Sequence, residues 1–173
     1  MKKFLSTIIL FFACSFIFAQ VKLQSLLTEN LTDPIGMDIK EPHFSWQLVS
    51  AKRNTSQSAY EIKVVSGKSS VWSSGKISSD QSVHVKYAGA ALQSGRKYNW
   101  KVRVWDNSGK ASAWSEVASF QTAFFNASDW KAKWIEAGFV EEASRPSPYF
   151  RKTFKTDKKI VSATAYITSH GMY

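Results

Sequence analysis

The sequence is poor in residues that build disulfides or metal sites. It holds one cysteine and three histidines (His43, His84 and His170) among 173 residues. One cysteine cannot form an intramolecular disulfide, and the histidines are too far apart for a paired-histidine metal motif. No glycine-rich phosphate loop and no Gly-x-Ser-x-Gly nucleophile motif is present. We therefore expect no metal ion, no cofactor and no catalytic residue in this chain.

Long apolar runs are also scarce, and the one at the N-terminus is too short for a membrane-spanning helix, which needs about 20 residues. Lys2 and Lys3 precede a mostly apolar stretch over 4–19. This order predicts a signal peptide over 1–19, cleaved after Ala19, and hence a secreted or periplasmic protein with no stable membrane anchor. A lipoprotein signal acylated at Cys14, or a retained anchor, is the less favoured alternative, because residues 11–13 fit poorly before an acylated cysteine and apolar residues continue past it.

Alternation of apolar and polar residues dominates the region from 21 to about 125. In an extended segment over 98–104, one face carries the apolar residues Tyr98, Trp100, Val102 and Val104. The other face carries Asn99, Lys101 and Arg103. A period of two is typical of a half-buried strand. Similar runs occur near 21–29, 44–48, 60–64, 71–77, 83–87 and 118–122. Seven short strands at such intervals predict an all-β sandwich of two sheets over residues 20–125.

Turn chemistry and one aromatic motif support this prediction. Residues 106–109 (Asp-Asn-Ser-Gly) predict a hairpin from the 98–104 strand to one starting near Trp114. The order Leu92 to Tyr98, followed by Trp100, resembles the tyrosine corner of fibronectin type III domains. In that corner the tyrosine hydroxyl bonds back to the loop backbone. Trp46 lies where those domains bury a core tryptophan. The resemblance implies a fibronectin type III-like (immunoglobulin-like) sandwich.

The pattern changes after residue 125. A polar linker over 126–129 leads to further alternation at 149–154 and 161–167, which predicts two strands. Two or three strands bury too little apolar surface to be stable alone. We therefore expect residues 126–173 to be the truncated start of a second β-sandwich, and the chain to be an N-terminal fragment of a longer polypeptide.

Taken together, short motifs along the chain resemble the N-terminal region of secreted bacterial α-L-rhamnosidases. They are Glu29-Asn30-Leu31, Pro34-Ile35-Gly36, Phe44-Ser45-Trp46, Val71-Trp72, Tyr98-x-Trp100, Trp105-Asp106, Trp130-x-Ala132-x-Trp134-Ile135, Phe150-Arg151-Lys152-x-Phe154 and Ala165-Tyr166-Ile167-Thr168.

The resemblance implies an accessory role beside a catalytic barrel further along the polypeptide. That family removes terminal L-rhamnose from glycosides with inversion, which requires two carboxyl groups about 6.5–9.5 Å apart. The family's acidic residues lie beyond Tyr173, so we assign no catalytic residue here and expect the chain itself to be inactive. Its expected partners are downstream domains of the same polypeptide and rhamnose-containing glycans. The alternative is a stand-alone secreted carbohydrate-binding or adhesion module.

Two tryptophans are the candidate sugar contacts, because an indole face suits the C–H face of a pyranose. Trp105 interrupts the polar face of its strand, and Trp72 lies in a run of uncertain orientation. Packing against a neighbouring domain is the competing interpretation for both. The adjacent carboxylates Glu141 and Glu142 fall in a polar loop, where a solvated pair is expected rather than catalysis.

The net charge of +10 raises the question of nucleic-acid binding. After removal of Lys2 and Lys3 with the leader, the charge is +8, and it is spread along the chain without a basic run. We therefore expect no nucleic-acid partner. Long-range attraction to anionic glycans or to the cell envelope is the remaining functional interpretation of this charge.

Overall fold

The computed structural model describes residues 21–138, 143 and 148–169. The predicted signal peptide and the Glu141–Glu142 pair lie outside these residues. The chain divides into two compact units, with the boundary between Lys131 and Ala132. Within the described residues, no helix is both long and apolar enough to cross a membrane.

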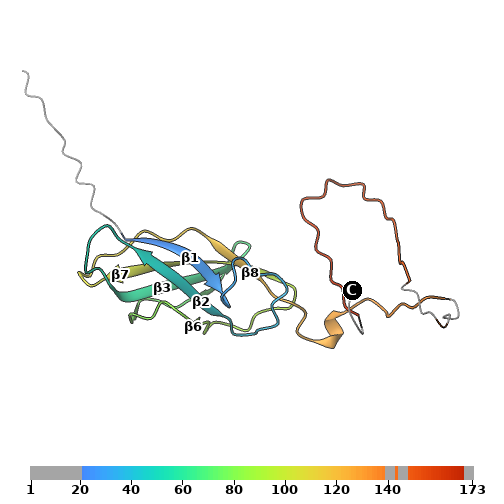
Figure 1. Cartoon of the computed structure of the whole chain (residues 1–173), viewed down its shortest axis with the longest axis horizontal. Coiled ribbons are helices and arrows are strands. Elements are labelled where there is room, and N and C mark those ends of the chain that lie inside the picture. The colour runs from blue at the N-terminus through green and yellow to red at the C-terminus, as the bar shows by residue number, and fades with distance from the viewer. Residues whose placement is uncertain (1–20, 139–142, 144–147, 170–173) are drawn as a thin grey trace, which may run out of the picture. The chain divides into compact units, whose positions relative to one another are not determined.

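The first unit is a sandwich of two antiparallel sheets (Figure 1). The three-stranded sheet has the order β1 (Lys22–Thr28), β2 (His43–Val49), β6 (Val85–Lys86). The five-stranded sheet has the order β4 (Ser69–Ser73), β3 (Gln57–Ser66), β7 (Lys97–Asp106), β8 (Ala118–Gln121), and β5 (Ile77–Ser78) pairs with β3. A short 3-10 helix, η1 (Ala127–Asp129), follows the last strand. The predicted all-β, immunoglobulin-like sandwich is confirmed.

The core lies between the two sheets and is rich in aromatic rings. Phe44 from β2 meets Trp100 from β7 with ring centroids 4.5 Å apart, and Trp46 meets Tyr60 of β3 at 5.4 Å. Each buried indole also has a hydrogen-bond partner. The Nε1 atom of Trp46 donates to Gln57 Oε1 over 3.0 Å, and that of Trp100 donates to Thr28 Oγ1 over 3.1 Å. Both tryptophans are therefore core residues, as the alternation predicts.

The tyrosine corner is present. Tyr98 is 3% exposed, and its Oη accepts a hydrogen bond from the backbone N–H of Gln93 over 2.8 Å. Leu92 is buried in the same core cluster. The Tyr98 ring stacks on Phe120 of β8 at 5.2 Å. This contact between a loop and two strands fixes the entry of β7 into the sheet.

Two details of the strand prediction are corrected. The 71–77 run is divided between β4 and β5, which pair with different parts of β3, because residues 74–76 form no ladder. The turn at 106–109 is present, but the next strand begins at Ala118 and not near Trp114. Residues 112–115 run alongside β7 and are held to it by hydrogen bonds to serine hydroxyls. Ser112 Oγ accepts from the N–H of Val104, and Ser115 Oγ accepts from the N–H of Val102, where a regular strand would offer carbonyl oxygens.

The second unit has no strand in its described residues, 132–138, 143 and 148–169. The two strands expected at 149–154 and 161–167 are therefore not formed there. Their large apolar side chains are exposed: 88% for Tyr149, 81% for Phe154 and 93% for Val161. A strand requires a ladder of backbone hydrogen bonds to a neighbouring strand, and the described residues of these segments belong to no strand.

Candidate functional site: a basic aromatic sheet face

Trp72 lies on β4 and is half-buried. Its ring meets Tyr87 edge to face at 5.1 Å. Gly89 lies directly against this pair, since a Cβ atom added there would come within 2.6 Å of Trp72 Cβ. Tyr87 itself donates its hydroxyl proton to Ala90 O over 2.7 Å, and burial raises the pKa of this phenol. The ring of Trp72 is thus fixed at the edge of the core, and its predicted sugar contact stays a prediction.

Trp105 lies elsewhere, near the end of β7, and is also half-buried. Two cations approach its ring. Lys76 Nζ is 4.7 Å from the ring centroid, and Arg103 Cζ is 4.9 Å from it. Cations are attracted to the negative face of an indole, so these contacts hold the lysine and arginine heads in place. The sugar contact predicted for Trp105 also stays a prediction.

A second indole, which the sequence pattern did not predict to be part of a site, completes this surface. Trp114 follows the 106–109 turn and receives three cations: Lys63 Nζ at 5.0 Å, Lys101 Nζ at 4.9 Å and Arg103 Cζ at 4.9 Å. The sequence did contain one indication of this surface, because Lys101 and Arg103 are two residues apart on β7 and therefore lie on the same outward side of the strand. Only the irregular 112–115 segment, held by serine hydroxyls, brings Trp114 onto that row.

The pairing of β3 with β7 explains why these side chains meet. Glu61 lies opposite Arg103, and Lys63 lies opposite Lys101. Residues directly opposite on antiparallel strands have neighbouring side chains, and two like charges there repel. The Trp114 ring contacts both lysine ammonium groups of the repelling pair.

One carboxylate balances part of the charge. Glu61 is 7% exposed, and its Oε2 accepts hydrogen bonds from Arg103 Nε over 2.8 Å and from Arg103 Nη2 over 2.6 Å. Lys63 Nζ is 3.7 Å from Glu61 Oε1. Four cations thus face one carboxylate. We call this surface the basic aromatic face; its members are Glu61, Lys63, Lys76, Lys101, Arg103, Trp105 and Trp114.

A separate groove of about 830 Å³ lies at the end of the sandwich, lined in part by Lys40, His43, Tyr87, Gly89 and Phe125. Lys40 Nζ lies 5.8 Å from the centroid of the Phe125 ring, and three other charged or titratable groups of the groove are in ion pairs. Lys86 Nζ is 2.6 Å from Glu41 Oε2, and the hydrogen bond and positive charge of Lys86 lower the pKa of the Glu41 carboxyl. His43 Nδ1 is 2.8 Å from Glu29 Oε1. Within the described residues, no group of three His, Cys, Asp or Glu side chains could hold a metal ion.

The two packed antiparallel sheets and the tyrosine corner define the first unit as an immunoglobulin-like domain. Residues 23–126 match the family described as the Rha78A-like, N-terminal immunoglobulin domain. The chain belongs to this family.

The alignments with individual relatives cover more of the chain than the family match does. A protein named α-L-rhamnosidase from Formosa agariphila is 38% identical in an alignment of 162 positions, which covers 85% of this chain. One of the same name from Streptomyces avermitilis is 35% identical in an alignment of 179 positions, which covers 88% of this chain. The chain spans only 17% of the length of each of these relatives. It is therefore homologous to the N-terminal part of α-L-rhamnosidases.

Solved structures agree with the sequence relatives. The crystal structure of the Streptomyces avermitilis α-L-rhamnosidase complexed with L-rhamnose has a TM-score of 0.65 and 42% identity, covering 68% of this chain and 12% of that one. The α-L-rhamnosidase structure from Dictyoglumus thermophilum has a TM-score of 0.63 and 36% identity, covering 70% of this chain and 14% of that one.

Proposed function

We propose that this chain is the N-terminal accessory part of a longer, exported α-L-rhamnosidase. The observation that carries the proposal is the alignment of 85–88% of the chain with proteins of that name, each about six times longer than the matched segment. An immunoglobulin-like fold does not by itself specify a function, so we infer the function from the polypeptide to which the domain belongs.

The reaction proposed for the whole polypeptide is the removal of terminal L-rhamnose from glycosides with inversion at the anomeric carbon. Inversion needs a carboxylic acid that protonates the leaving oxygen and a carboxylate that activates water. We assign neither role to a residue of this chain. The first unit instead contributes a rigid module with its own aromatic core, which supports the domains that follow.

We further propose that residues 1–19 are a signal peptide cleaved after Ala19, so that the protein is secreted or periplasmic. The absence of cysteine after residue 19 means that the sandwich is held by packing and hydrogen bonds without disulfides. Residues 126–173 are proposed to begin a second β-sandwich. The apolar, alternating side chains of 149–167 would then be covered by strands from further along the polypeptide.

The test is to express the complete reading frame that contains this sequence and to measure hydrolysis of p-nitrophenyl α-L-rhamnopyranoside. The proposal expects activity from the complete product and none from residues 20–173. A complete product that cleaves no α-L-rhamnoside would contradict it. A stop codon directly after codon 173 would instead favour the stand-alone binding or adhesion module.

A further inference from the structure

We propose that the basic aromatic face is a binding surface for an anionic polysaccharide, one that carries carboxylate or sulfate groups. The first observation is that two of its lysines lack an acidic partner. Lys76 and Lys101 have no acidic side chain within ion-pair distance among the described residues, and each is held over an indole ring instead. Their positive charges are therefore available to a ligand.

The second observation is that these cations already lie over the indole rings in the folded domain. A free lysine side chain loses rotamer freedom when it is immobilised in an interface, and this loss opposes binding. Here the contacts with Trp105 and Trp114 restrict the ammonium groups at 4.7 Å and 4.9 Å from the ring centroids. The lysine side chains therefore lose less conformational entropy when a ligand binds, and this favours the binding of anionic groups.

The third observation is the layout of charge. The face carries four cations against a single carboxylate, and that carboxylate, Glu61, is occupied by the two nitrogens of Arg103. Lys101 and Arg103 are two residues apart on β7, so they project from the same side of the strand. Glu61 balances the charge of Arg103, so the positive charge left on the face is that of its lysines, which suits a linear chain with repeated anionic groups.

The kinds of residue on the basic aromatic face favour a polysaccharide over an acidic protein as its ligand. The cations that lack an acidic partner are lysines, which are depleted at protein–protein interfaces. On this side of β3 the aliphatic residues Ala59 and Val65 lie opposite Trp105 and Asn99, but Ala59 is 2% exposed and Val65 is half-buried, so they offer little apolar surface for an interface core. The indoles supply apolar ring surface beside the charges, which matches a pyranose bearing an acidic group.

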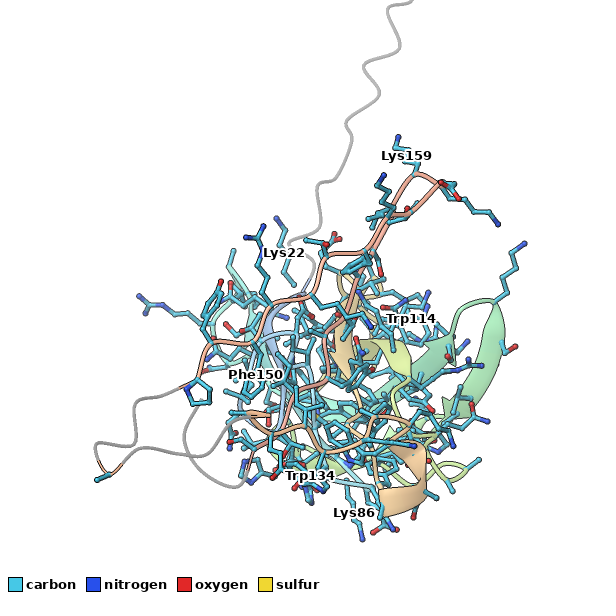
Figure 2. The ribbon with its side chains drawn as sticks, turned by 90° about the vertical axis from the view of Figure 1, so that its right-hand side faces the viewer. Lys22, Lys86, Trp114, Trp134, Phe150 and Lys159 are labelled. Atoms are coloured by element: carbon cyan, nitrogen blue, oxygen red, sulfur yellow. The ribbon has the colours of Figure 1, made fainter. Side chains whose placement is uncertain are left out.

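The experiment compares two variants with the same net charge. K76Q/K101Q removes the two lysines without acidic partners and leaves Glu61, Arg103 and both tryptophans intact. K22Q/K52Q removes two exposed lysines elsewhere; Lys22 belongs to the opposite sheet and lies apart from Trp114 in Figure 2. Binding of residues 20–173 is measured by calorimetry with polygalacturonate, dextran sulfate, neutral dextran and poly-L-glutamate. Melting temperatures confirm that both variants are folded.

The proposal expects polygalacturonate or dextran sulfate to bind, neutral dextran not to bind, and added salt to weaken the interaction. K76Q/K101Q should lower the affinity by about tenfold or more, whereas K22Q/K52Q should change it by less than about twofold. If K76Q/K101Q proves unstable, K76Q alone, at an exposed position outside the strands, should still lower the affinity.

Three results would overturn the proposal: no binding of either anionic polysaccharide, equal loss in the two double variants, or poly-L-glutamate binding as tightly as polygalacturonate. The second would mean that only net charge matters, and the third would point to an acidic protein partner. The assignment to an α-L-rhamnosidase is independent of this surface, and hydrolysis by the complete product would stand whichever result is obtained.

Discussion

The two units of this chain carry similar sequence patterns with different structural outcomes. In β7, alternate residues Tyr98, Trp100 and Val102 are all at most 3% exposed. In the second unit, residues 161–167 alternate in the same way, yet Val161 is 93% exposed and Ile167 is 64% exposed. Alternation makes a segment capable of being a strand, but it does not supply the neighbours that bury its apolar face.

The neighbours of β7 show what the second unit lacks. β3 and β8 flank it in the five-stranded sheet, and Phe44 from the opposite sheet covers Trp100. A single hairpin or a pair of short strands has no second layer, and such structures are marginally stable at best in water. The comparison therefore assigns the stability of this chain to the first unit.

The sharpest way to break this comparison is to truncate one large ring in each unit. Trp100→Ala removes a side chain that is 1% exposed and leaves the Thr28 hydroxyl without its indole donor. We expect it to lower the free energy of unfolding by about 3–5 kcal/mol. Phe154→Ala, at a ring that is 81% exposed, should change it by no more than about 0.5 kcal/mol. Urea unfolding followed by tryptophan fluorescence measures both, and similar losses would mean that the second unit shares the core.

A second variant probes the buried charge pair under the basic aromatic face. Glu61→Gln removes the negative partner of Arg103 at a site that is 7% exposed. Hydrogen bonds to charged groups contribute about 1.5–3 kcal/mol, so we expect a loss of that size in the same urea experiment. Glu116→Gln, at an exposed carboxylate, is the matched control and should be near neutral. Equal effects would remove the structural role assigned to Glu61.

The tyrosine corner predicts a smaller effect. Tyr98→Phe keeps the ring stacked on Phe120 and deletes only the acceptor for the Gln93 N–H. The expected loss is about 1 kcal/mol, the usual contribution of one hydrogen bond. Tyr149→Phe, at a tyrosine that is 88% exposed, should leave the melting temperature unchanged. An unchanged melting temperature for Tyr98→Phe would show that the corner contributes nothing to stability.

The smallest effect concerns pH. The Ser108 hydroxyl and the backbone N–H groups of Ser108 and Lys110 donate to the Asp106 carboxylate and lower its pKa. A carboxyl whose pKa is lower in the folded state stabilises the fold above its ordinary pKa, near 4, and loses this contribution as the pH falls through its folded value. Melting temperatures should therefore fall less steeply with acidification in Asp106→Asn than in the wild type. If the melting temperatures of the two proteins fell equally steeply with pH, the stabilising role of the Asp106 carboxylate would be contradicted.

How much of this could be predicted depends on the range of the interactions. The strand at 98–104, the Asp-Asn-Ser-Gly turn and the tyrosine corner are local, so alternation and turn residues sufficed to predict them. Trp46 and Trp100 were predicted as core residues because each lies on the apolar side of its strand. The division of 71–77 into β4 and β5 depends on pairing with β3, which no local pattern contains.

The candidate site was less predictable. Trp105 was selected because it interrupts a polar face, but nothing in the sequence places Lys76 over its ring. Trp114 was expected near the start of a strand, and it lies instead in a segment held to β7 by the hydroxyls of Ser112 and Ser115. The basic aromatic face thus comes from the register of β3 on β7 and from one irregular segment, both of which are properties of the folded chain.

Hydrogen exchange along residues 20–173 tests most directly whether the two units differ in stability. The account predicts that backbone amides of β2, β3 and β7 exchange slowly, as in an independent cooperative domain, while those of 148–169 exchange at rates near those of an unstructured peptide. Protection of 148–169 as strong as that of β3 would contradict it, because it would show that the second unit forms a stable structure from its own residues.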